Sequence, residues 1–504
     1  MSGMKPFPKV ELPRIPERDF LITQFGAVGD GMTDNTEAIE RAIAACDRAG
    51  GGRVVIPAGL WLTGPIVLRS RMELHAASGA LVTFSRNFEQ YPLIVSQFEG
   101  QPAVRCRAPI DGEKLEDIAI TGPGVFDGSG DAWRPVKRMK LTASQWKQRI
   151  ASGGVVAENA EGEIWWPTAQ AMHGEAEIRR LQQEGSLDPA EYWAARDYLR
   201  PALVSLRGCR RLLLDGPTFQ NSPGWCLHPW GSEHVTVRHT TVRNPWYSQN
   251  GDGLDIDSCR FVTVDGCSFD VGDDAICMKS GKDEAGRRLA MPCEYVTVTN
   301  CKVYHGHGGF VIGSEMSGGV NHIRVSDCDF MGTDIGLRFK SARGRGGIVE
   351  DIRIENIRMK DIALEAISFH LFYQGVEGSE GFDDREYPVD EGTPVFRKIT
   401  MRNIYCAGAS VGLLVNGLAE MPLSDCLLEK AVIQSERGIL CRFAAGLKLR
   451  NIRLQVKEGP LASFHECKDV EMVEWQGETK DTSVNTPILV TGNSSANIKV
   501  APLA

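Results

Sequence analysis

The sequence predicts a right-handed parallel β-helix, because short alternating strands recur at a nearly constant spacing through the middle of the chain. A fixed period of about this length is typical of proteins that stack one coil on the next. The runs are rich in Val, Ile and Thr and are broken by Gly, Asn and Asp, so we expect strands rather than helices. The six runs begin at His234, Phe261, Tyr295, His322, Asp351 and Lys398, at intervals of 27, 34, 27, 29 and 47 residues.

The amino-terminal part precedes this repeat. Residues 1–20 are rich in proline, and we expect them to be extended. We assign residues 21–504 to a single β-helix domain, because a solenoid grows by adding coils and needs no division into globular parts. Asp34 and Glu37 match a capping box, and apolar residues follow at helical spacing, which predicts an amphipathic helix over residues 35–48. This helix is expected to cap the open end of the first coil.

Two stretches interrupt the coil pattern. Residues 131–200 are charged and rich in Trp, with helical character, and they are predicted to form a helical insert. Residues 374–396 are acidic and rich in Gly, and they are predicted to form a loop insert. Insertions of this length in a compact fold are usually functional.

Alignment of the repeats gives the buried positions. Cys267, Cys301 and Cys328 share one position, which Ile357 and Ile404 occupy in later repeats. Because thiol alternates with aliphatic side chain, we interpret these cysteines as core residues rather than metal ligands or disulfide partners. A set of asparagines, Asn300, Asn356 and Asn403, shares the preceding position and is expected to form a structural ladder at a corner.

Composition limits the partners. The net charge is −9 and the pI is about 5.7, which argues against nucleic acid or an anionic membrane as a partner. The sequence has no run of 18 apolar residues, so we expect no transmembrane helix. The first residues also lack the apolar segment of a signal peptide. Fourteen cysteines without CxxC spacing fit a reducing compartment. We therefore expect a cytoplasmic protein, or a secreted or periplasmic one if a leader was removed.

Three carboxylates stand close together in the sequence: Asp252, Asp273 and Asp274. Asp273 lies six residues after Cys267 and His307 lies six after Cys301, so the repeat register predicts that they fall at one position of successive coils. Clustered acids repel one another, and this keeps one carboxyl group protonated as a general acid. Glycoside hydrolysis by inversion needs one such acid and one carboxylate that holds a water molecule.

A cationic pair follows one coil later. Arg338 and Lys340 differ by two positions, so their side chains point the same way from a strand. A guanidinium and an ammonium group together suit a substrate carboxylate, which predicts an acidic sugar as substrate. The alternative is a calcium site at Asp252, Asp255, Asp257 and Asp273. We expect no metal and no cofactor, because the ligand set for calcium is incomplete in this pattern.

The motifs N-G-D at Asn250, G-D-D at Gly272, G-H-G at Gly306 and R-F-K at Arg338, in this order, resemble the signature of glycoside hydrolase family 28, the polygalacturonases and their relatives. The N-S-P-G-W segment at 221–225 resembles the coil before the family's site. The F-G-A-V-G-D-G segment at 25–31 is similar to the opening of many pectin-active β-helices. The resemblance covers most of the chain to about residue 420.

The resemblance implies a role for each matched residue. Asp273 would be the general acid, Asp252 and Asp274 would activate the water, and His307 would tune this network. Arg338 and Lys340 would hold the uronate carboxylate, Asn250 would bind substrate, and Tyr373 matches an aromatic residue that touches sugar. The family implies no cofactor.

We therefore expect an inverting glycoside hydrolase that cleaves α-1,4-galacturonosyl linkages of pectin fragments from the non-reducing end. The 374–396 insert would wall the end of the groove opposite the 131–200 insert, and a blocked end favours exo attack. A cytoplasmic enzyme would also meet only imported oligosaccharides, which favours the same mode. Trp165 and Trp166 would provide a wall on which sugar stacks, or would be buried. The alternatives are a rhamnogalacturonan hydrolase, an endo-polygalacturonase, a pectate lyase and a noncatalytic β-helix that binds sugar. The sequence does not predict an oligomeric state.

Overall fold

The computed structural model describes residues 7–159, 162–373, 384–483 and 486–502. Two compact units are present. The N-terminal unit comprises Val10–Asp255 and Asp270–Asp273, and the C-terminal unit comprises Ile256–Phe269, Asp274–Ala504 and the described part of Met1–Lys9. Both are built of parallel coils, as the sequence predicts, while the assignment of residues 21–504 to one domain stays a prediction. No helix in the described ranges is both long and apolar enough to cross a membrane.

The coils of the N-terminal unit stack in parallel register. Most coils contribute one strand to each of three columns, so that the same position of one coil lies beside its counterpart in the next. The first column holds β1 (Asp19–Leu21), β3 (Gly52–Ile56), β6 (Met72–Ala76), β11 (Glu116–Thr121), β17 (Arg210–Asp215) and β20 (Glu233–Arg238). The second holds β2 (Asp30–Asp34), β4 (Gly59–Thr63), β7 (Ala80–Phe84), β12 (Val125–Asp127), β18 (Thr218–Gln220) and β21 (Thr241–Arg243). The third holds β5 (Ile66–Val67), β10 (Ile110–Glu113), β16 (Val204–Arg207) and β19 (Leu227–Trp230).

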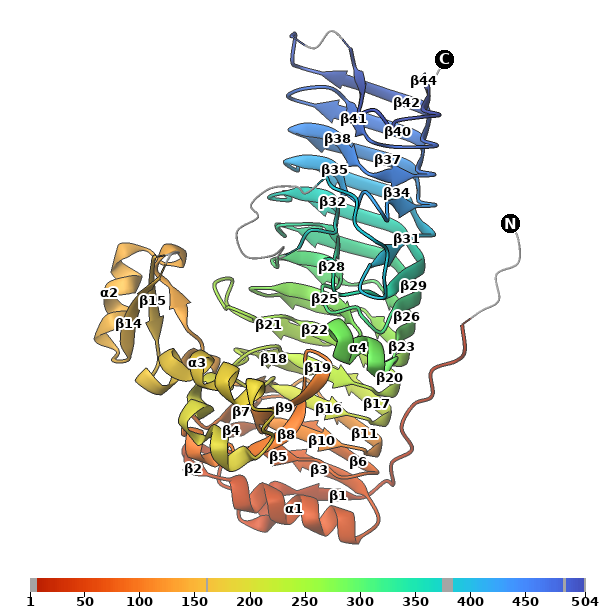
Figure 1. Cartoon of the computed structure of the whole chain (residues 1–504). Helices are drawn as coiled ribbons and strands as arrows, with labels where there is room; N and C mark the ends of the chain where they lie inside the picture. The colour runs from red at the N-terminus through yellow and green to blue at the C-terminus, as the bar shows by residue number, and fades with distance from the viewer. Residues whose placement is uncertain (1–6, 160–161, 374–383, 484–485, 503–504) are drawn as a thin grey trace. The chain divides into compact units, whose positions relative to one another are not determined.

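The predicted capping helix is α1 (Thr36–Arg48), which packs against β1, β3 and β5 of the first coils (Figure 1). Its buried face consists of Ala38, Ile39, Ala42, Ile43 and Cys46, the period-3.6 positions of the sequence. The predicted capping box is absent from this helix. The Asp34 carboxylate instead accepts the Thr36 backbone N–H at 2.9 Å, and Glu37 lies 3.5 Å from Arg41.

The insert at 131–200 is helical, as predicted, but it also contains a small antiparallel sheet. Its helices are α2 (Ala143–Ala151), α3 (Ala169–Gln183) and the 3₁₀ segment η5 (Pro189–Tyr198), and its strands are β13 (Val136–Lys137), β14 (Val155–Asn159) and β15 (Gly162–Trp166). Trp165 is buried against Val136 and Trp146 in a core of the insert's own, so it offers no stacking wall. Trp166 is half-buried and stacks on Tyr198 at 6.0 Å.

A second antiparallel element of this unit is the hairpin β8 (Leu93–Phe98) and β9 (Gln101–Cys106). One hydrophobic cluster joins this hairpin to α3 and η5 through Val104, Cys106, Leu181, Tyr192 and Leu199. Apolar burial of this kind stabilises an irregular element that has few ladder hydrogen bonds of its own. The hairpin and η5 are therefore held together as one structural block.

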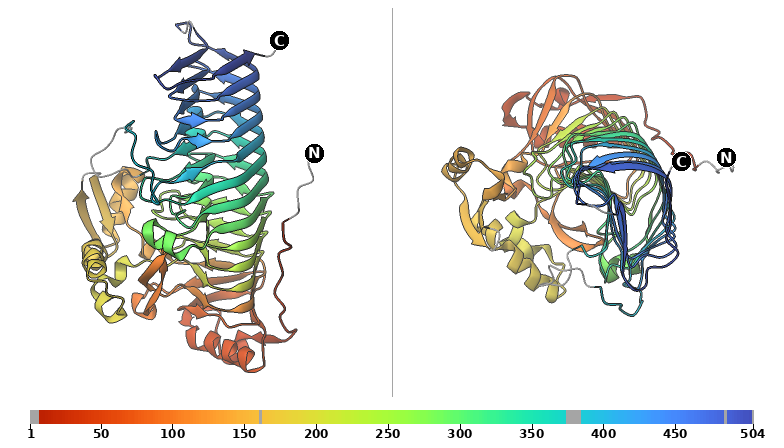
Figure 2. Two further views of the ribbon diagram at one scale, coloured as in Figure 1. Left: turned by 45° about the vertical axis from the view of Figure 1, so that its right-hand side comes forward. Right: turned by 90° about the horizontal axis from the view of Figure 1, so that it is seen from above.

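The C-terminal unit contains the longer run of coils, which overlie one another in the view from above (Figure 2, right). One column holds β23 (Arg260–Asp265), β26 (Cys293–Thr299), β29 (Val320–Met331), β31 (Ile348–Lys360), β34 (Ile399–Ala407), β37 (Leu427–Ser435), β40 (Lys448–Val456), β42 (Glu471–Thr479) and β44 (Lys499–Pro502). The other holds β25 (Asp274–Lys279), β28 (Gly308–Ile312), β30 (Leu337–Lys340), β32 (Glu365–His370), β35 (Val411–Asn416), β38 (Arg437–Arg442), β41 (Ala462–His465) and β43 (Ile488–Thr491).

Shorter elements complete the chain. They are η1 (Ile22–Phe25), η2 (Phe88–Gln90), η3 (Gly130–Ala132), η4 (Arg138–Lys140), α4 (Asp283–Leu289), β22 (Leu254–Asp257), β24 (Ser268–Asp270), β27 (Lys302–Val303), β33 (Val395–Phe396), β36 (Leu423–Ser424) and β39 (Ala444–Ala445). Of the predicted loop insert at 374–396, residues 374–383 lie outside the described ranges, and 384–394 have no strand or helix.

The predicted repeat register is confirmed in the C-terminal unit. Ile352 pairs with Ile323 of the preceding coil and with Ile399 of the next. Cys328 likewise lies opposite Ile357, and all fourteen cysteines are buried and form no disulfide.

The corners of the coils use the left-handed backbone conformation. The residues that open the predicted repeats, Tyr295, His322, Asp351 and Lys398, have φ between 52° and 55°. At a second corner, the Asn403 side chain donates to the amide oxygen of Asn356 at 2.8 Å, and Asn356 donates to Asp327 at 2.9 Å. Asn and Asp tolerate this conformation better than most residues, so the predicted asparagine ladder is structural.

Candidate active site

Asp252 lies at the end of an irregular loop, 245–251, that leaves the regular coil of the N-terminal unit. The buried side-chain amide of Asn244 donates to the backbone carbonyls of Gly251 at 3.1 Å and of Asp252 at 3.2 Å. Asp252 O in turn accepts the backbone N–H of Cys226 at 3.0 Å, which joins this segment to β19. The sequence did not reveal Asn244 as a positioning residue, although it stands one coil after Asn221 of the N-S-P-G-W segment.

Two glycines allow the Asp252 loop and the Asp273 turn to approach each other. Gly272 N–H points to the carbonyl of Gly251 at 3.4 Å. A Cβ atom at Gly251 would lie 1.9 Å from the Ser248 Oγ, and one at Gly272 would lie 2.5 Å from the Pro245 carbonyl oxygen. The middle residue of N-G-D is therefore glycine because the Ser248 side chain lies too close for a Cβ atom.

This approach brings two of the predicted carboxylates together. One oxygen of Asp252 and one of Asp273 lie within 4.8 Å, with Asp252 buried and Asp273 half-buried. Two carboxyl groups at this separation favour a state in which only one is ionised. Inverting glycosidases typically place their two carboxyl groups about 6.5–9.5 Å apart. The nearest oxygens of Asp252 and Asp273 are closer than this, but the distance between nearest oxygens is only a lower limit to the separation of the two groups.

Asp274 follows Asp273 directly and opens β25 in the C-terminal unit. Its carboxylate is 1% exposed and accepts the Lys340 ammonium at 2.7 Å and the Arg338 guanidinium at 3.2 Å. Both cations belong to β30 and point the same way, as their spacing predicts. The structure therefore pairs the predicted uronate ligands with a site carboxylate, which the sequence did not indicate.

Two further buried charges extend this cluster. Lys279, at the end of β25, donates to the Glu315 carboxylate at 2.9 Å. Burial opposes ionisation of Glu315, but Lys279 and Lys340 outweigh it and hold the pKa of this carboxyl well below its usual range. Burial likewise opposes the charge of Lys340, while Asp274 raises its pKa above the ordinary value. The sequence missed Lys279 and Glu315 because neither lies in a recognised motif.

His307 lies in the turn before β28, one coil after β25. Asp274 pairs with Gly308, so the G-H-G motif falls at the predicted register. The His307 Nε2 lies 3.8 Å from the Asp334 carboxylate, and the His307 carbonyl accepts Arg338 at 3.4 Å. His307 thus holds Arg338 through its backbone, and its ring has an acidic neighbour.

The remaining predicted residues divide between the two units. The Tyr373 ring centroid lies 4.8 Å from the Lys340 Nζ and 5.6 Å from the Arg338 guanidinium. This aromatic ring is therefore in cation–π contact with both cations. Asn250, in the N-terminal unit, accepts Arg200 at 2.9 Å. Arg200 stands at the end of the predicted insert, and the sequence did not single it out.

Comparison with known proteins gives consistent similarities. The model of "Glycosyl hydrolases family 28" matches residues 193–385, and a "Rhamnogalacturonase A/epimerase, pectate lyase-like" model matches residues 20–100. An exo-poly-alpha-D-galacturonosidase of Dickeya chrysanthemi is 28% identical over 76% of this chain and 61% of its own length.

Solved structures are similar over most of the chain. An exopolygalacturonase from Thermotoga maritima is 31% identical with a TM-score of 0.72, covering 85% of this chain and 89% of that one. A family 28 exopolygalacturonase from Yersinia enterocolitica is 21% identical with a TM-score of 0.66, covering 96% of this chain and 78% of that one, which supports the fold.

Proposed function

Since the chain belongs to glycosyl hydrolase family 28, we propose that it is an exo-acting hydrolase that removes galacturonate from the non-reducing end of pectin-derived oligogalacturonides. The enzymes of Dickeya and Thermotoga named above support this substrate and mode of attack. The proposed partner is an acidic oligosaccharide.

The pairing of Asp274 with two cations is the observation that carries the assignment of roles. Lys340 at 2.7 Å and Arg338 at 3.2 Å both form ion pairs with Asp274. An oxygen of the neighbouring residue Asp273 lies within 4.8 Å of an oxygen of Asp252. At this distance, the state in which one of these two carboxyl groups is ionised and the other is protonated is favoured. We assign this proton to Asp273, as the resemblance of its G-D-D motif to that of the family implies.

The proposed reaction follows from this division of charge. Asp273 gives its proton to the leaving glycosidic oxygen as the anomeric C–O bond breaks. Asp252 and Asp274 hold the attacking water, and one of them accepts its proton, so the product receives the hydroxyl group on the opposite face. His307 supports the site by binding Arg338 through its carbonyl oxygen. Arg338 and Lys340, with Tyr373 beside them, bind the uronate carboxylate next to the scissile bond.

A time course on purified trigalacturonate tests the proposal. An exo enzyme releases galacturonate and digalacturonate in equal amounts in its first turnovers and continues to monomer. Proton NMR of the first product reports the stereochemistry, and a β-anomer is expected for inversion.

Other products would overturn the proposal. On a longer oligomer, fragments of many lengths from the start would indicate endo attack, and an unsaturated product that absorbs ultraviolet light would indicate a lyase. Cleavage of rhamnogalacturonan fragments but not of trigalacturonate would favour the rhamnogalacturonan alternative, for which the match at residues 20–100 provides the specific observation.

A further inference from the structure

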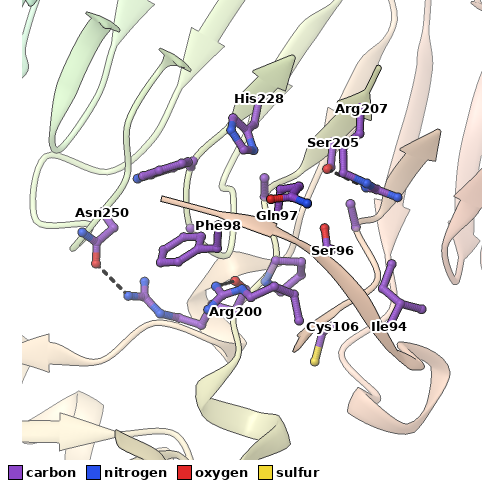
Figure 3. A pocket seen from close by; sticks show the side chains of 16 residues that line it. Ile94, Ser96, Gln97, Phe98, Cys106, Arg200, Ser205, Arg207, His228 and Asn250 are labelled. Atoms are coloured by element: carbon purple, nitrogen blue, oxygen red, sulfur yellow. Dashed lines mark hydrogen bonds between the residues drawn. The ribbon is translucent and has the colours of Figure 1, made fainter. Parts of the chain in front are cut away.

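A pocket lies beside Asp252 in the N-terminal unit, between the β8–β9 hairpin, the end of η5 and the coil strands β16 and β19. Figure 3 shows the side chains of Phe98, Arg200 and His228 around it, with Asn250 at one edge. The pocket is lined by residues from both the insert block and the coils. It therefore exists only because the insert packs on its own unit.

Two arginines line this pocket without a carboxylate partner. Among the residues that the structure describes, Arg105 donates one hydrogen bond, to the backbone carbonyl of Arg200, and its guanidinium lies 4.1 Å from the centroid of Phe98. Arg200 donates to the carbonyls of Pro223 at 3.1 Å and Gln249 at 2.8 Å, and to the side chain of Asn250. Neither forms an ion pair within the described ranges.

A third arginine in the same pocket behaves differently. Arg207 is buried, and its guanidinium lies 2.6 Å from the Asp111 carboxylate. Burying a cation without a counter-ion costs free energy. Burial lowers the pKa of Arg200 to about 10, with Arg105 adding repulsion, and burial also lowers the pKa of Arg105. An anion entering the pocket would relieve this cost.

The pocket also offers flat apolar surfaces. The rings of Phe98 and Trp225 stack at 5.1 Å, and His228 lies edge-on to Trp225 at 5.0 Å. Pockets that combine aromatic walls with a few convergent polar groups are the usual form of small-molecule sites. The ligand that suits this one has a ring with an apolar face and an anionic group.

The pocket is joined to the catalytic carboxylates through the Asp252 loop. Arg200 donates hydrogen bonds to Gln249 and Asn250, which lie three and two residues before Asp252, and the Asp252 carboxylate favours the charged form of the Arg200 guanidinium. A sugar in the pocket would therefore lie next to Asp252.

We propose that this pocket binds the terminal uronate of the substrate, and that Arg105 and Arg200 bind its carboxylate. The proposal rests on the function proposed above and adds a second carboxylate site to the pair Arg338 and Lys340. Because the β8–β9 hairpin and the segment that begins at Arg200 wall the pocket, they would account for attack at the chain end. Arg105 is the better residue to test, since Arg200 also supports the Asp252 loop.

The test compares two substrates and three variants. The substrates are trigalacturonate and the same trimer with only its non-reducing terminal carboxyl group methyl-esterified. The variants are Arg105→Gln, Arg105→Lys and, as a surface control, Arg210→Gln, whose side chain is half exposed. Thermal unfolding of each variant checks that it folds.

Arg105→Gln is expected to lower kcat/KM for the acid by about tenfold or more, the usual effect of losing a charge-assisted hydrogen bond, and to change the ester by less than about threefold. Arg105→Lys should recover part of the loss, and Arg210→Gln should match the parent. An equal loss on both substrates, or none on either, would overturn the proposal. If the parent cleaves neither trimer, the proposed function fails. Calorimetry then tests the pocket separately, because equal affinity of the parent for the acid and the ester would reject the proposed carboxylate site.

Discussion

Two pairs of cations in this protein have opposite surroundings. In the C-terminal unit, Arg338 and Lys340 share the Asp274 carboxylate, and Lys279 with Glu315 lies beside them. In the N-terminal unit, Arg105 and Arg200 line a pocket and form no ion pair within the described ranges. The first pair has a carboxylate of the protein within ion-pair distance, whereas the second pair has none among the described residues.

The difference separates two tasks that acidic-sugar recognition combines. A cation paired with a catalytic carboxylate fixes the protonation state of that carboxylate, and it stabilises the empty site. A cation without a carboxylate adds little to stability but attracts an anion strongly. The three predictions below test this separation, from the largest effect to the smallest.

Asp273→Asn should separate chemistry from binding. Loss of the general acid is expected to lower kcat by about a thousandfold or more. The substitution leaves Arg105 and Arg200 intact. Calorimetry should therefore give a dissociation constant of the variant for trigalacturonate that lies within about threefold of the dissociation constant of the parent. Asp329→Asn, on a face paired with Arg358, is the matched control and should keep parental activity. Turnover near the parental rate in Asp273→Asn would assign the acid to another residue.

Lys340→Met should destabilise the fold far more than Arg105→Gln. Removing Lys340 leaves the buried Asp274 carboxylate with one cation fewer, which costs about 3–5 kcal/mol for a broken buried pair. Arg105→Gln removes one of two mutually repelling cations and should change stability by less than about 1 kcal/mol. The midpoint of urea denaturation measures both effects.

The double variant Lys340→Met, Asp274→Asn provides the control for this interpretation. It removes the orphaned charge, so its denaturation midpoint should rise above that of Lys340→Met alone. Equal destabilisation by Lys340→Met and Arg105→Gln would contradict the proposed difference between the two cation pairs.

Acid should weaken the C-terminal cluster through Glu315. Its pKa in the folded protein lies well below the ordinary value of 4.5, so its contribution is complete above pH 4.5 and is lost as pH falls below it. Urea denaturation midpoints from pH 6 to pH 3 should therefore converge for the parent and Glu315→Gln. The Arg105→Gln variant should follow the parent over the same range, and a difference that widens on acidification would refute the assignment.

Much of the C-terminal unit could be predicted from sequence because its order is periodic. The alternation of Val, Ile and Thr located the strands, and the left-handed corners fall on the residues that open each repeat, such as His322 and Asp351. The same register placed His307 in the coil after Asp274. Because the repeat length is nearly constant, the spacing of the motif residues in the sequence indicates the coil in which each of them lies.

The pocket could not be predicted in the same way. Phe98, Arg105, Arg200 and Trp225 come from separate segments, and the hairpin and insert that carry three of them do not follow the repeat. The ion pairs of Arg338 and Lys340 with Asp274 could not be predicted from the sequence either. The repeat register fixes backbone positions, but which side chains of neighbouring coils form ion pairs depends on the distances between their charged groups.

The sequence by itself determined the β-helix, the order of its coils and the set of acids and cations, because a backbone that repeats at a constant interval leaves little freedom in where each motif falls. The tertiary structure alone decided which charges neutralise one another. Whether a pocket arginine meets a carboxylate, as Arg207 does, or has none among the described residues, as is the case for Arg105, depends on packing between segments that lie far apart in the chain.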